Sequence, residues 1–408
     1  MKLTRKQFLG ATVAAISGTI TPSLFGAVKE KRKIKLNGSS LKIKKLVLKD
    51  NDYILGPGVV ELTGPDAIVI QGKNVVLDNV SFKASIGPKK HSSAIRMLQG
   101  CENLTIKNCA FEGDAYCVLK ADINSNKDGD LTFDKPVGPI TFINNSCDGF
   151  SRHIYLSSVS RINIEGNFFK NSARDSIRLR QGVRKVLISK NTFDNVGKKT
   201  GESADAIDTY WSGEELIISS NIINNCAVHG LDLKGISPDG KGASSKVIVE
   251  NNIINGCVFS GILVSSGKVH LKKKNKVADF IIKSNVIKNC NKNNKNPNDA
   301  AIFLRHGVQG CIISLNQISS SNGHGIVLGN FEEKAEQTKN ITIAENQIVS
   351  KSGDCVRVFA ADNVVLARNI FESRKNKASV KLFKRYKSFE LAKVLETDNL
   401  ESVIDHET

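Results

Sequence analysis

A short phrase recurs along most of the chain and constrains the fold more than any other feature of the sequence. In each copy, alternating apolar residues lead into an Asn that is followed by further apolar residues. The copies run from NVVLDNVSF to NVVLARNIF, and their asparagines are Asn79, Asn108, Asn145, Asn167, Asn191, Asn221, Asn252, Asn285, Asn316, Asn346 and Asn369. Neighbouring copies are between 22 residues (145 to 167) and 37 residues (108 to 145) apart. This period indicates an array of stacked units rather than an ordinary compact domain.

A unit this short cannot bury its apolar face alone, but stacked copies can, because each strand pairs in parallel with the equivalent strand of the next unit. Asn suits the bend between strands since it tolerates left-handed backbone geometry, and its amide can bond to the Asn of the next unit. The sequence therefore predicts an all-β protein: a single right-handed parallel β-helix of about ten to twelve coils with an Asn ladder and terminal caps. A leucine-rich repeat is disfavoured because no LxxLxL phrase recurs, and the shortest units cannot hold the four strands of a propeller blade.

The extent of the repeat sets the expected boundaries. We expect an export signal over 1–27, an N-terminal cap over 28–65, the β-helix over 66–376 and a C-terminal cap or tail over 377–408. In that tail, SVKLFKR is expected as a last strand, followed by a charged segment of helical character that covers the end of the stack. Insertions are expected to leave the stack as walls or lids of a groove at 122–138, 197–204, 236–244, 268–276 and 330–338.

The first residues have the pattern of a secretory signal: a basic start, a short apolar run and then small residues. TRKQFL resembles the twin-arginine export motif with Lys6 in place of the second Arg, so the export route stays open. We therefore expect a periplasmic or secreted protein. No other segment is apolar enough to suggest a membrane span.

The formal net charge of +18 indicates an anionic partner, because such a surplus attracts polyanions. The usual nucleic-acid modules are missing from the sequence, so we expect an acidic polysaccharide and no nucleic acid. Lysine-rich stretches such as KKKNK at 272–276 indicate that much of this charge is solvated surface. The nine cysteines lack CxxC or zinc spacing and are interpreted as buried thiols. We expect a monomer.

A second strand precedes each Asn phrase, and these strands align from AIRML (94–98) to CVRVF (355–359). Their second and fourth residues are expected to point inward, and their third and fifth residues outward to solvent. The third positions are assigned to Arg96, Val118, Tyr155, Arg178, Asp208, Asp232, Leu263, Phe303, Val327 and Arg357, and the fifth positions include Lys120, Arg180, Tyr210, Lys234, Ser265 and Arg305. Since neighbouring strands lie about 4.8 Å apart, we expect Tyr210 beside Lys234 and Asp208 beside Asp232.

The polar outward residues concentrate between the coils that begin near 153 and 229, and we interpret this cluster as a candidate site. Outward residues can simply be solvated, and cross-strand Arg–Asp pairs stabilise sheets modestly. Two stacked carboxylates, however, repel each other unless a cation or a substrate lies between them, which favours a site. The candidates are Tyr210 and Lys234 as catalytic residues, Arg178, Arg180, His229, Tyr155, Lys120 and Arg305 as substrate-binding residues, and Asp208 and Asp232 as an acidic pair with a catalytic or cation-binding role. His229 is either a reserve acid or base or a structural His at a corner.

Residues 66–376 resemble the right-handed parallel β-helix enzymes that act on carbohydrates, especially the polysaccharide lyases of the pectate-lyase superfold. A Tyr and a Lys on neighbouring coils resemble the catalytic pair of the β-helical alginate lyases. This resemblance implies a secreted lyase that cleaves a uronate-containing, alginate-like polysaccharide by β-elimination. In that reaction a cation neutralises the carboxylate, a base removes the C5 proton and an acid protonates the leaving oxygen. Arg178 or Arg180 suits the first task. Tyr210 and Lys234 share the other two, and which of them is the base stays open.

Other readings remain open. Asp208 and Asp232 also suit a β-helical glycoside hydrolase or a uronate epimerase, and their oxygens suit Ca²⁺, so a calcium cofactor is left open. LRHG (304–307) resembles the Arg-His-Gly phrase of the calcium-dependent chondroitinase-B-like lyases, although Ser265 stands where that family has its Lys. The stretch from 298 to 329 resembles the β-helical polygalacturonases, but the pair of adjacent Asp in that family is Asn298-Asp299 here. A non-catalytic, polysaccharide-binding β-helix is a further alternative.

Overall fold

The computed structural model describes residues 32–89, 92–121, 137–180, 182–197, 204–210, 214–234, 246–265, 277–291, 300–305, 307–320, 322–329, 337–359, 361–374, 377–382 and 394–404. These belong to one compact unit that spans 32–408. All the regular elements in these ranges are β-strands. None of the described segments forms a helix long and apolar enough to cross a membrane. The expected export signal over 1–27, and all or most of each expected insertion, lie outside the described residues.

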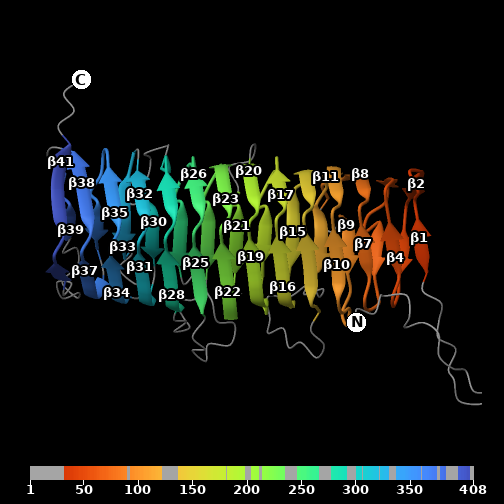
Figure 1. The fold of residues 1–408 in the computed structure, drawn as a ribbon, viewed down its shortest axis with the longest axis horizontal. Helices are drawn as coiled ribbons and strands as arrows, with labels where there is room; N and C mark the ends of the chain where they lie inside the picture. Colours follow the sequence, from red (N-terminus) through yellow and green to blue (C-terminus); the bar gives the residue numbers. More distant parts are fainter. Residues whose placement is uncertain are drawn as a thin grey trace, which may run out of the picture. The chain divides into compact units, whose positions relative to one another are not determined.

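Three parallel sheets run the length of this unit, and each coil supplies one strand to each sheet, so that every strand pairs with the strand three places later. The coils follow one another in chain order (Figure 1). Sheet A consists of β1 (Lys33–Lys35), β4 (Tyr53–Leu55), β7 (Val76–Asp78), β10 (Leu104–Lys107), β13 (Ile140–Ile143), β16 (Ser160–Glu165), β19 (Arg184–Ser189), β22 (Glu214–Ser219), β25 (Val247–Glu250), β28 (Val277–Lys283), β31 (Val308–Ser314), β34 (Thr338–Ala344), β37 (Ala361–Ala367) and β40 (Val394–Thr397).

Sheet B follows sheet A in each coil. It consists of β2 (Ser40–Ile43), β5 (Val59–Leu62), β8 (Ser81–Gly87), β11 (Ala110–Ala115), β14 (Ser146–Gly149), β17 (Phe168–Lys170), β20 (Thr192–Val196), β23 (Ile222–Cys226), β26 (Ile253–Asn255), β29 (Val286–Lys288), β32 (Gln317–Ser320), β35 (Gln347–Ser350), β38 (Ile370–Arg374) and β41 (Leu400–Ile404).

Sheet C completes each coil and carries the aligned strands that hold the candidate site. It consists of β3 (Leu46–Leu48), β6 (Ile68–Ile70), β9 (Ser93–Met97), β12 (Cys117–Ala121), β15 (Arg152–Leu156), β18 (Ile177–Leu179), β21 (Ile207–Tyr210), β24 (Leu231–Lys234), β27 (Ile262–Ser265), β30 (Ala300–Arg305), β33 (His324–Leu328), β36 (Val356–Val358) and β39 (Val380–Leu382).

The predicted parallel β-helix is confirmed, but the expected count of ten to twelve coils is too low. Sheets A and B have 14 strands each and sheet C has 13. The first two coils lack the Asn phrase, and residues 33–62 of the expected cap already supply β1 to β5 to the three sheets. At the other end, β39 lies within the predicted last strand. The described part of the tail forms β40 and β41 and is therefore not helical, because its apolar residues continue the sheet pairing of the previous coil.

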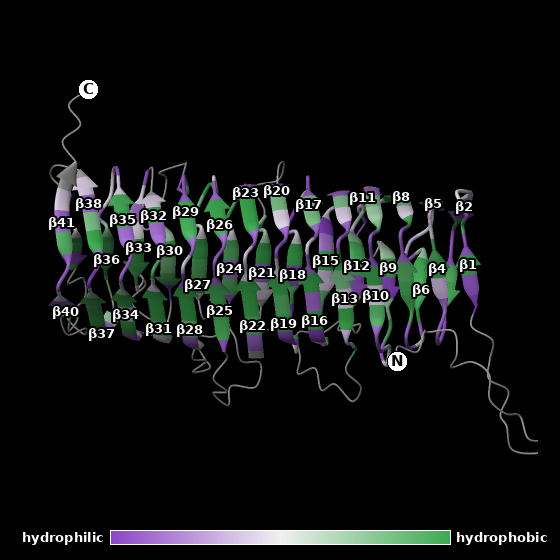
Figure 2. Cartoon of the chain, viewed as in Figure 1, coloured by the Kyte–Doolittle hydropathy of each residue, from purple (hydrophilic) through white to green (hydrophobic). Residues whose placement is uncertain are grey.

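The interior is a continuous apolar column in which phenylalanines of successive coils stack on one another. The ring centroids of Phe82 and Phe111 lie 4.8 Å apart, and those of Phe169 and Phe193 lie 5.1 Å apart. Figure 2 shows mostly hydrophobic strands through the middle of the stack, whereas β1 at its first coil is largely hydrophilic. All nine cysteines are buried thiols, as their spacing predicts.

The predicted Asn ladder lies at the corner between sheets A and B. Each amide donates to the Oδ1 of the next Asn and to a backbone carbonyl of an earlier coil, as Asn221 does to Asn252 and to Ile188, both at 2.9 Å. The ladder comprises Asn145, Asn167, Asn191, Asn221, Asn252, Asn285, Asn316, Asn346, Asn369 and Asn399.

Two details of the predicted ladder are wrong. Asn79 and Asn108 lie one position before it, so that Cys109 takes the ladder position and donates its backbone N–H to Asn145. The left-handed backbone also belongs to this preceding position, where Asn79 has φ 59° and Asn108 has φ 55°. At this corner the left-handed bend and the ladder bond are therefore made by adjacent residues, and the left-handed Asn108 donates instead to Asp78 of the previous coil at 3.0 Å.

Candidate active site

Sheet C aligns the candidate residues as the repeat predicts. Asp208 pairs with Asp232 and Tyr210 pairs with Lys234 between β21 and β24. Arg178 in β18 is the partner of Asp208 on the other side. These residues are not simply solvated, as outward positions of a sheet were expected to be: Asp208 is 0% exposed and Asp232 is 4% exposed. Carboxylates that are removed from water in this way require charged partners.

The partners form a chain of alternating charges across four coils. Its members, in spatial order, are Arg152, Asp175, Arg178, Asp208, Lys234 and Asp232. Along the first half, Asp175 Oδ2 lies 3.2 Å from Arg152 Nε and 3.1 Å from Arg178 Nη1. Arg178 Nε in turn faces Asp208 Oδ2 at 3.1 Å.

Lys234 closes the second half of this chain. Its ammonium lies 3.1 Å from Asp208 Oδ1 and also contacts Asp232 Oδ2. Burial lowers the pKa of Lys234, but the two carboxylates outweigh burial and hold this pKa above its ordinary value. A lysine with a raised pKa stays protonated and is a poor base. This arrangement disfavours the role of Lys234 as the residue that removes a proton.

The two carboxyls next to Lys234 differ in their access to solvent. The side chain of Asp232 is 6% exposed and that of Asp208 is 0% exposed, whereas Lys234 and Arg178 reach the surface with 25% and 19% exposure. Burial raises the pKa of Asp232 to about 7, despite the opposing effect of Lys234. Asp232 is therefore a carboxyl that can hold a proton near neutral pH and release it at the rim of the cluster.

Sequence reasoning missed three members of this site: Arg152, Asp175 and Asp205. All three are buried, with exposures of 2%, 0% and 1%. Each lies three residues before the outward third position of its strand. The missed signal is the spacing Asp-x-x-Arg (175–178), Asp-x-x-Asp (205–208) and His-x-x-Asp (229–232) at the same place in three successive coils.

His229 occupies the position of Asp175 and Asp205 in the next coil. Its Nδ1 accepts the backbone N–H of Ser260 at 3.1 Å, and its ring packs 5.8 Å from that of Phe259. Burial, together with the positive charges of Lys234 and Arg305, lowers the pKa of His229 to about 3. The structure therefore favours the structural role of His229 over a role as reserve acid or base.

The remaining candidates fall at different distances from the chain of charges. Tyr155 pairs directly with Arg178. Ser265 pairs with Lys234 in the next coil, and Arg305 pairs with Ser265, so Arg305 lies two coils beyond Lys234. β18 ends at Leu179, one residue before Arg180. For Tyr210 only the backbone lies within the described part of the chain, and nothing further is placed for its side chain.

One column assignment is wrong. Lys120 pairs with Arg96 and with Tyr155, so it belongs to the third-position column and not to that of Lys234. Val118, which the sequence assigned to the third-position column, lies in the apolar core instead. The strand CVLKA starts one residue earlier in the repeat than the other strands, and its alternation alone could not reveal this offset.

A divalent cation does not fit the described residues well. Ca²⁺ takes six to eight oxygen ligands. Here Lys234 already bonds to an oxygen of Asp208 and one of Asp232, and Nδ1 of His229 accepts a backbone N–H. Among the described side chains, the buried carboxylate oxygens without a hydrogen bond are Asp205 Oδ2, Asp208 Oδ2 and Asp232 Oδ1, and Arg178 faces the second of these.

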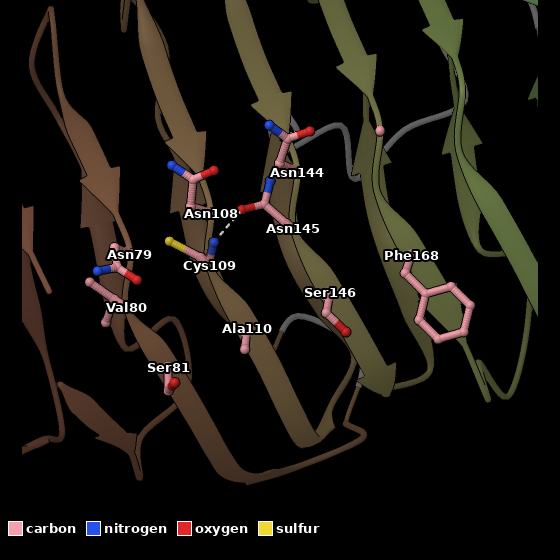
Figure 3. A pocket seen from close by; sticks show the side chains of 11 residues that line it. Asn79, Val80, Ser81, Asn108, Cys109, Ala110, Asn144, Asn145, Ser146 and Phe168 are labelled. Atoms are coloured by element: carbon pink, nitrogen blue, oxygen red, sulfur yellow. Dashed lines mark hydrogen bonds between the residues drawn. The ribbon is translucent and has the colours of Figure 1, made fainter. Parts of the chain in front are cut away.

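A cavity of about 370 Å³ lies elsewhere, at the corner between sheets A and B. Its lining includes Asn79, Asn108 and Asn144, which follow one another on successive coils in Figure 3. Cys109 is its single ionisable residue, and burial raises the pKa of this thiol to about 11. This shallow corner has no acid, base or cation for chemistry near neutral pH, so we assign the candidate active site to the charged cluster on sheet C.

The chain belongs to the family described as "Right handed beta helix region", whose model matches residues 33–197, 93–277 and 243–388. This match confirms the predicted right-handed coil. No curated protein sequence matches the chain.

Solved structures with the same fold include enzymes whose names state a polysaccharide substrate. The catalytic domain of a GH87 alpha-1,3-glucanase in complex with tetrasaccharides is 13% identical, with a TM-score of 0.52, and covers 91% of this chain and 61% of its own. The same domain in complex with nigerose has a TM-score of 0.51, 13% identity and coverages of 90% and 64%. An Azotobacter vinelandii mannuronan C-5 epimerase A-module is 11% identical, with a TM-score of 0.49, and covers 91% of each chain. The chain thus spans less than two thirds of the glucanase chains. At these identities the likeness shows the fold alone.

Proposed function

We propose that this protein is a polysaccharide-processing enzyme that hydrolyses glycosidic bonds at the charged cluster on sheet C. The observation that carries the proposal is the contrast between two neighbouring carboxyls. Asp232 is at the rim with a pKa raised to about 7, whereas Asp208 lies between the cations of Arg178 and Lys234. Pairs of carboxyls whose surroundings separate their protonation states are the usual acid and charge-stabilising groups of glycosidases.

In this reaction Asp232 donates its proton to the glycosidic oxygen as the bond to the sugar carbon breaks. A water molecule forms the new bond to that carbon and returns a proton to the Asp232 carboxylate. Asp208 supplies the negative charge that stabilises the positive charge developing on the sugar ring. Lys234 holds both carboxyls and, with Arg178, presents positive charge at the surface of the cluster. Together with the net charge of +18, these two cations favour an acidic polysaccharide as substrate.

Elimination by a Tyr/Lys pair is the second candidate. It is favoured by the register of β21 and β24, which places the backbones of Tyr210 and Lys234 side by side. The raised pKa of Lys234 leaves Tyr210 as the base in that reading. A uronate epimerase would use the same first step and rests on the same register.

The experiment that separates these reactions analyses the products formed from polygalacturonate, mannuronan and alpha-1,3-glucan. Hydrolysis predicts new reducing ends without the ultraviolet absorbance of unsaturated uronates. Unsaturated product would support the lyase and overturn hydrolysis. We also propose that the enzyme acts in the periplasm or outside the cell, as the pattern of residues 1–27 suggests. Fractionation of cells that produce the full chain tests this location.

A further inference from the structure

Asp205 is the carboxyl of the cluster for which the described residues provide no cationic partner. It lies three residues before Asp208 and is 1% exposed. Its Oδ1 accepts the backbone N–H of His229 at 2.8 Å, and its Oδ2 has no hydrogen-bond partner. The backbone N–H of Asp205 donates to Asp175 Oδ1 at 3.4 Å. The side chain is thus fixed by backbone contacts but not neutralised by an ion pair.

Negative charge surrounds Asp205 from three coils. Carboxylate oxygens of Asp175, Asp205 and Asp208 lie within 4.8 Å of one another. Oxygens of Asp205 and Asp232 and a ring nitrogen of His229 also lie within 4.8 Å of one another. Burial, followed by the charge of Asp232, raises the pKa of Asp205 well above its ordinary value.

Once Asp232 has released its proton, the charges of the cluster do not balance if the other three carboxyls are also ionised. The acids are Asp175, Asp205, Asp208 and Asp232, and the cations that form ion pairs with them within the described part of the chain are Arg152, Arg178 and Lys234. Four negative charges minus three positive charges leave one negative charge in a buried site. An uncompensated buried charge is strongly unfavourable, so either a proton or a bound cation must neutralise it.

A proton fits the described atoms better than a metal ion. A protonated carboxyl needs only one acceptor, whereas a divalent cation needs several ligands. Asp232 Oδ1 has no hydrogen-bond partner and belongs to the carboxyl within 4.8 Å of Asp205. His229 cannot serve as a ligand through Nδ1, because that atom already accepts the N–H of Ser260.

We propose that Asp205 is held as a neutral carboxylic acid and acts as a positioning residue that sets the proton affinity of Asp232. This inference rests on the proposed function only for its effect on catalysis, because Asp232 is the proposed proton donor. A neutral Asp205 adds no negative charge next to Asp232. Asp232 can then lose its proton near neutral pH, which an ionised Asp205 would oppose.

The test compares the full-length protein with Asp205→Asn, in which a neutral amide replaces the carboxyl. Infrared difference spectra at pH 8 should show one protonated-carboxyl band in the wild type that is absent from Asp205→Asn. The melting temperature of Asp205→Asn at pH 8 should equal or exceed that of the wild type. Asp148→Asn is the matched control, since Asp148 lies on the outer face of sheet B with Lys170 as its partner, and it should keep the band.

Three results would overturn this assignment. They are the absence of the difference band, a marked fall in melting temperature in Asp205→Asn, and stabilisation of the wild type by added Ca²⁺ that EDTA reverses and Asp205→Asn abolishes. The last result would identify a cation in place of the proton.

These readouts need no substrate, so they separate this inference from the proposed function. If the band is present but Asp232→Asn still hydrolyses glycans, the proposed function fails and the assignment of Asp205 stands. In an active enzyme, Asp205→Asn should also leave the basic limb of the kcat/KM profile within about 0.5 pH unit of the wild type. A shift to lower pH by a whole unit would show that Asp205 is ionised.

Discussion

Two columns of buried polar residues run along this β-helix, and they differ in how completely their hydrogen bonds are satisfied. In the Asn ladder, each amide of the run from Asn145 to Asn369 finds both a neighbouring Asn and a backbone carbonyl. In the cluster on sheet C, oxygens of Asp205, Asp208 and Asp232 have no hydrogen bond. Both use the same repeat geometry, but the ladder has one Asn per coil, whereas the cluster spans four coils and has two members in most of them.

The difference indicates two kinds of selection on the same scaffold. A satisfied column lowers the free energy of folding and fixes the register between coils. A column with stacked carboxylates and unsatisfied oxygens raises the free energy of the folded protein, which is expected where pKa values are tuned for chemistry. We therefore attribute a stabilising role to the ladder and a functional role to the carboxyls of the cluster. Neutralising Asp232 should impair activity with little effect on folding, whereas truncating a ladder Asn should lower stability.

The largest expected effect is on activity. Asp232→Asn removes the proposed proton donor but keeps its shape, so hydrolysis should fall by about 10²- to 10⁴-fold with little change in folding. Initial rates of reducing-end release measure this loss. The control Asp148→Asn should retain wild-type rates, and an Asp232→Asn enzyme of equal activity would contradict the role of Asp232.

Next in size is the effect of Lys234→Met on stability. This change leaves Asp208 and Asp232 without their shared cation and should lower the free energy of unfolding by about 3–5 kcal/mol. Urea denaturation measures it. Lys190→Met breaks an exposed pair with Glu165 and should cost less than about 1 kcal/mol. If adding Asp232→Asn to Lys234→Met restores none of the loss, the ion-pair account is wrong.

A smaller loss is expected in the ladder. Asn221→Ala removes an amide that donates to Asn252 and Ile188 and an oxygen that accepts from Asn191, so it should cost about 1–3 kcal/mol. The neighbouring Asn225→Gly removes an exposed bond to Asp194 and keeps the left-handed backbone of this position (φ 56°), so it should be nearly neutral. Equal effects of the two changes on urea denaturation would remove the distinction between ladder and surface.

The smallest expected effect is the pH dependence of stability that Asp232 contributes. Its folded pKa of about 7 is above its unfolded value, so its contribution is complete below pH 4 and is lost as the pH rises to about 7. Two histidines oppose this trend, because burial lowers the pKa of His153 to about 4 and that of His229 to about 3. The difference in melting temperature between wild type and Asp232→Asn isolates the effect. The melting temperature of the variant should rise relative to that of the wild type from pH 4 to pH 7. A difference that stays constant would contradict the raised pKa of Asp232.

The sequence was enough to predict the fold and the pairings within the site. Period-two alternation and the repeated Asn phrase determine which strands are neighbours, and so Asp208 lies next to Asp232. The number of coils was not predictable from that phrase, because the first coils have other residues at the corner. The alternation predicts which side chains point out of the coil, but it did not predict that some of them, such as Asp208, are buried. Arg152, Asp175 and Asp205 were missed because they lie at or before the start of their strands, outside the positions that alternation assigns.

The most direct test of the central claim, that Asp232 is the general acid, is the pH profile of kcat/KM for hydrolysis of an acidic polysaccharide. This profile reports the pKa values of the free enzyme. We predict that activity falls along a basic limb centred near pH 7, where Asp232 loses its proton. Activity that continues to rise towards pH 10, with unsaturated product, would contradict the account and indicate elimination by a tyrosine base.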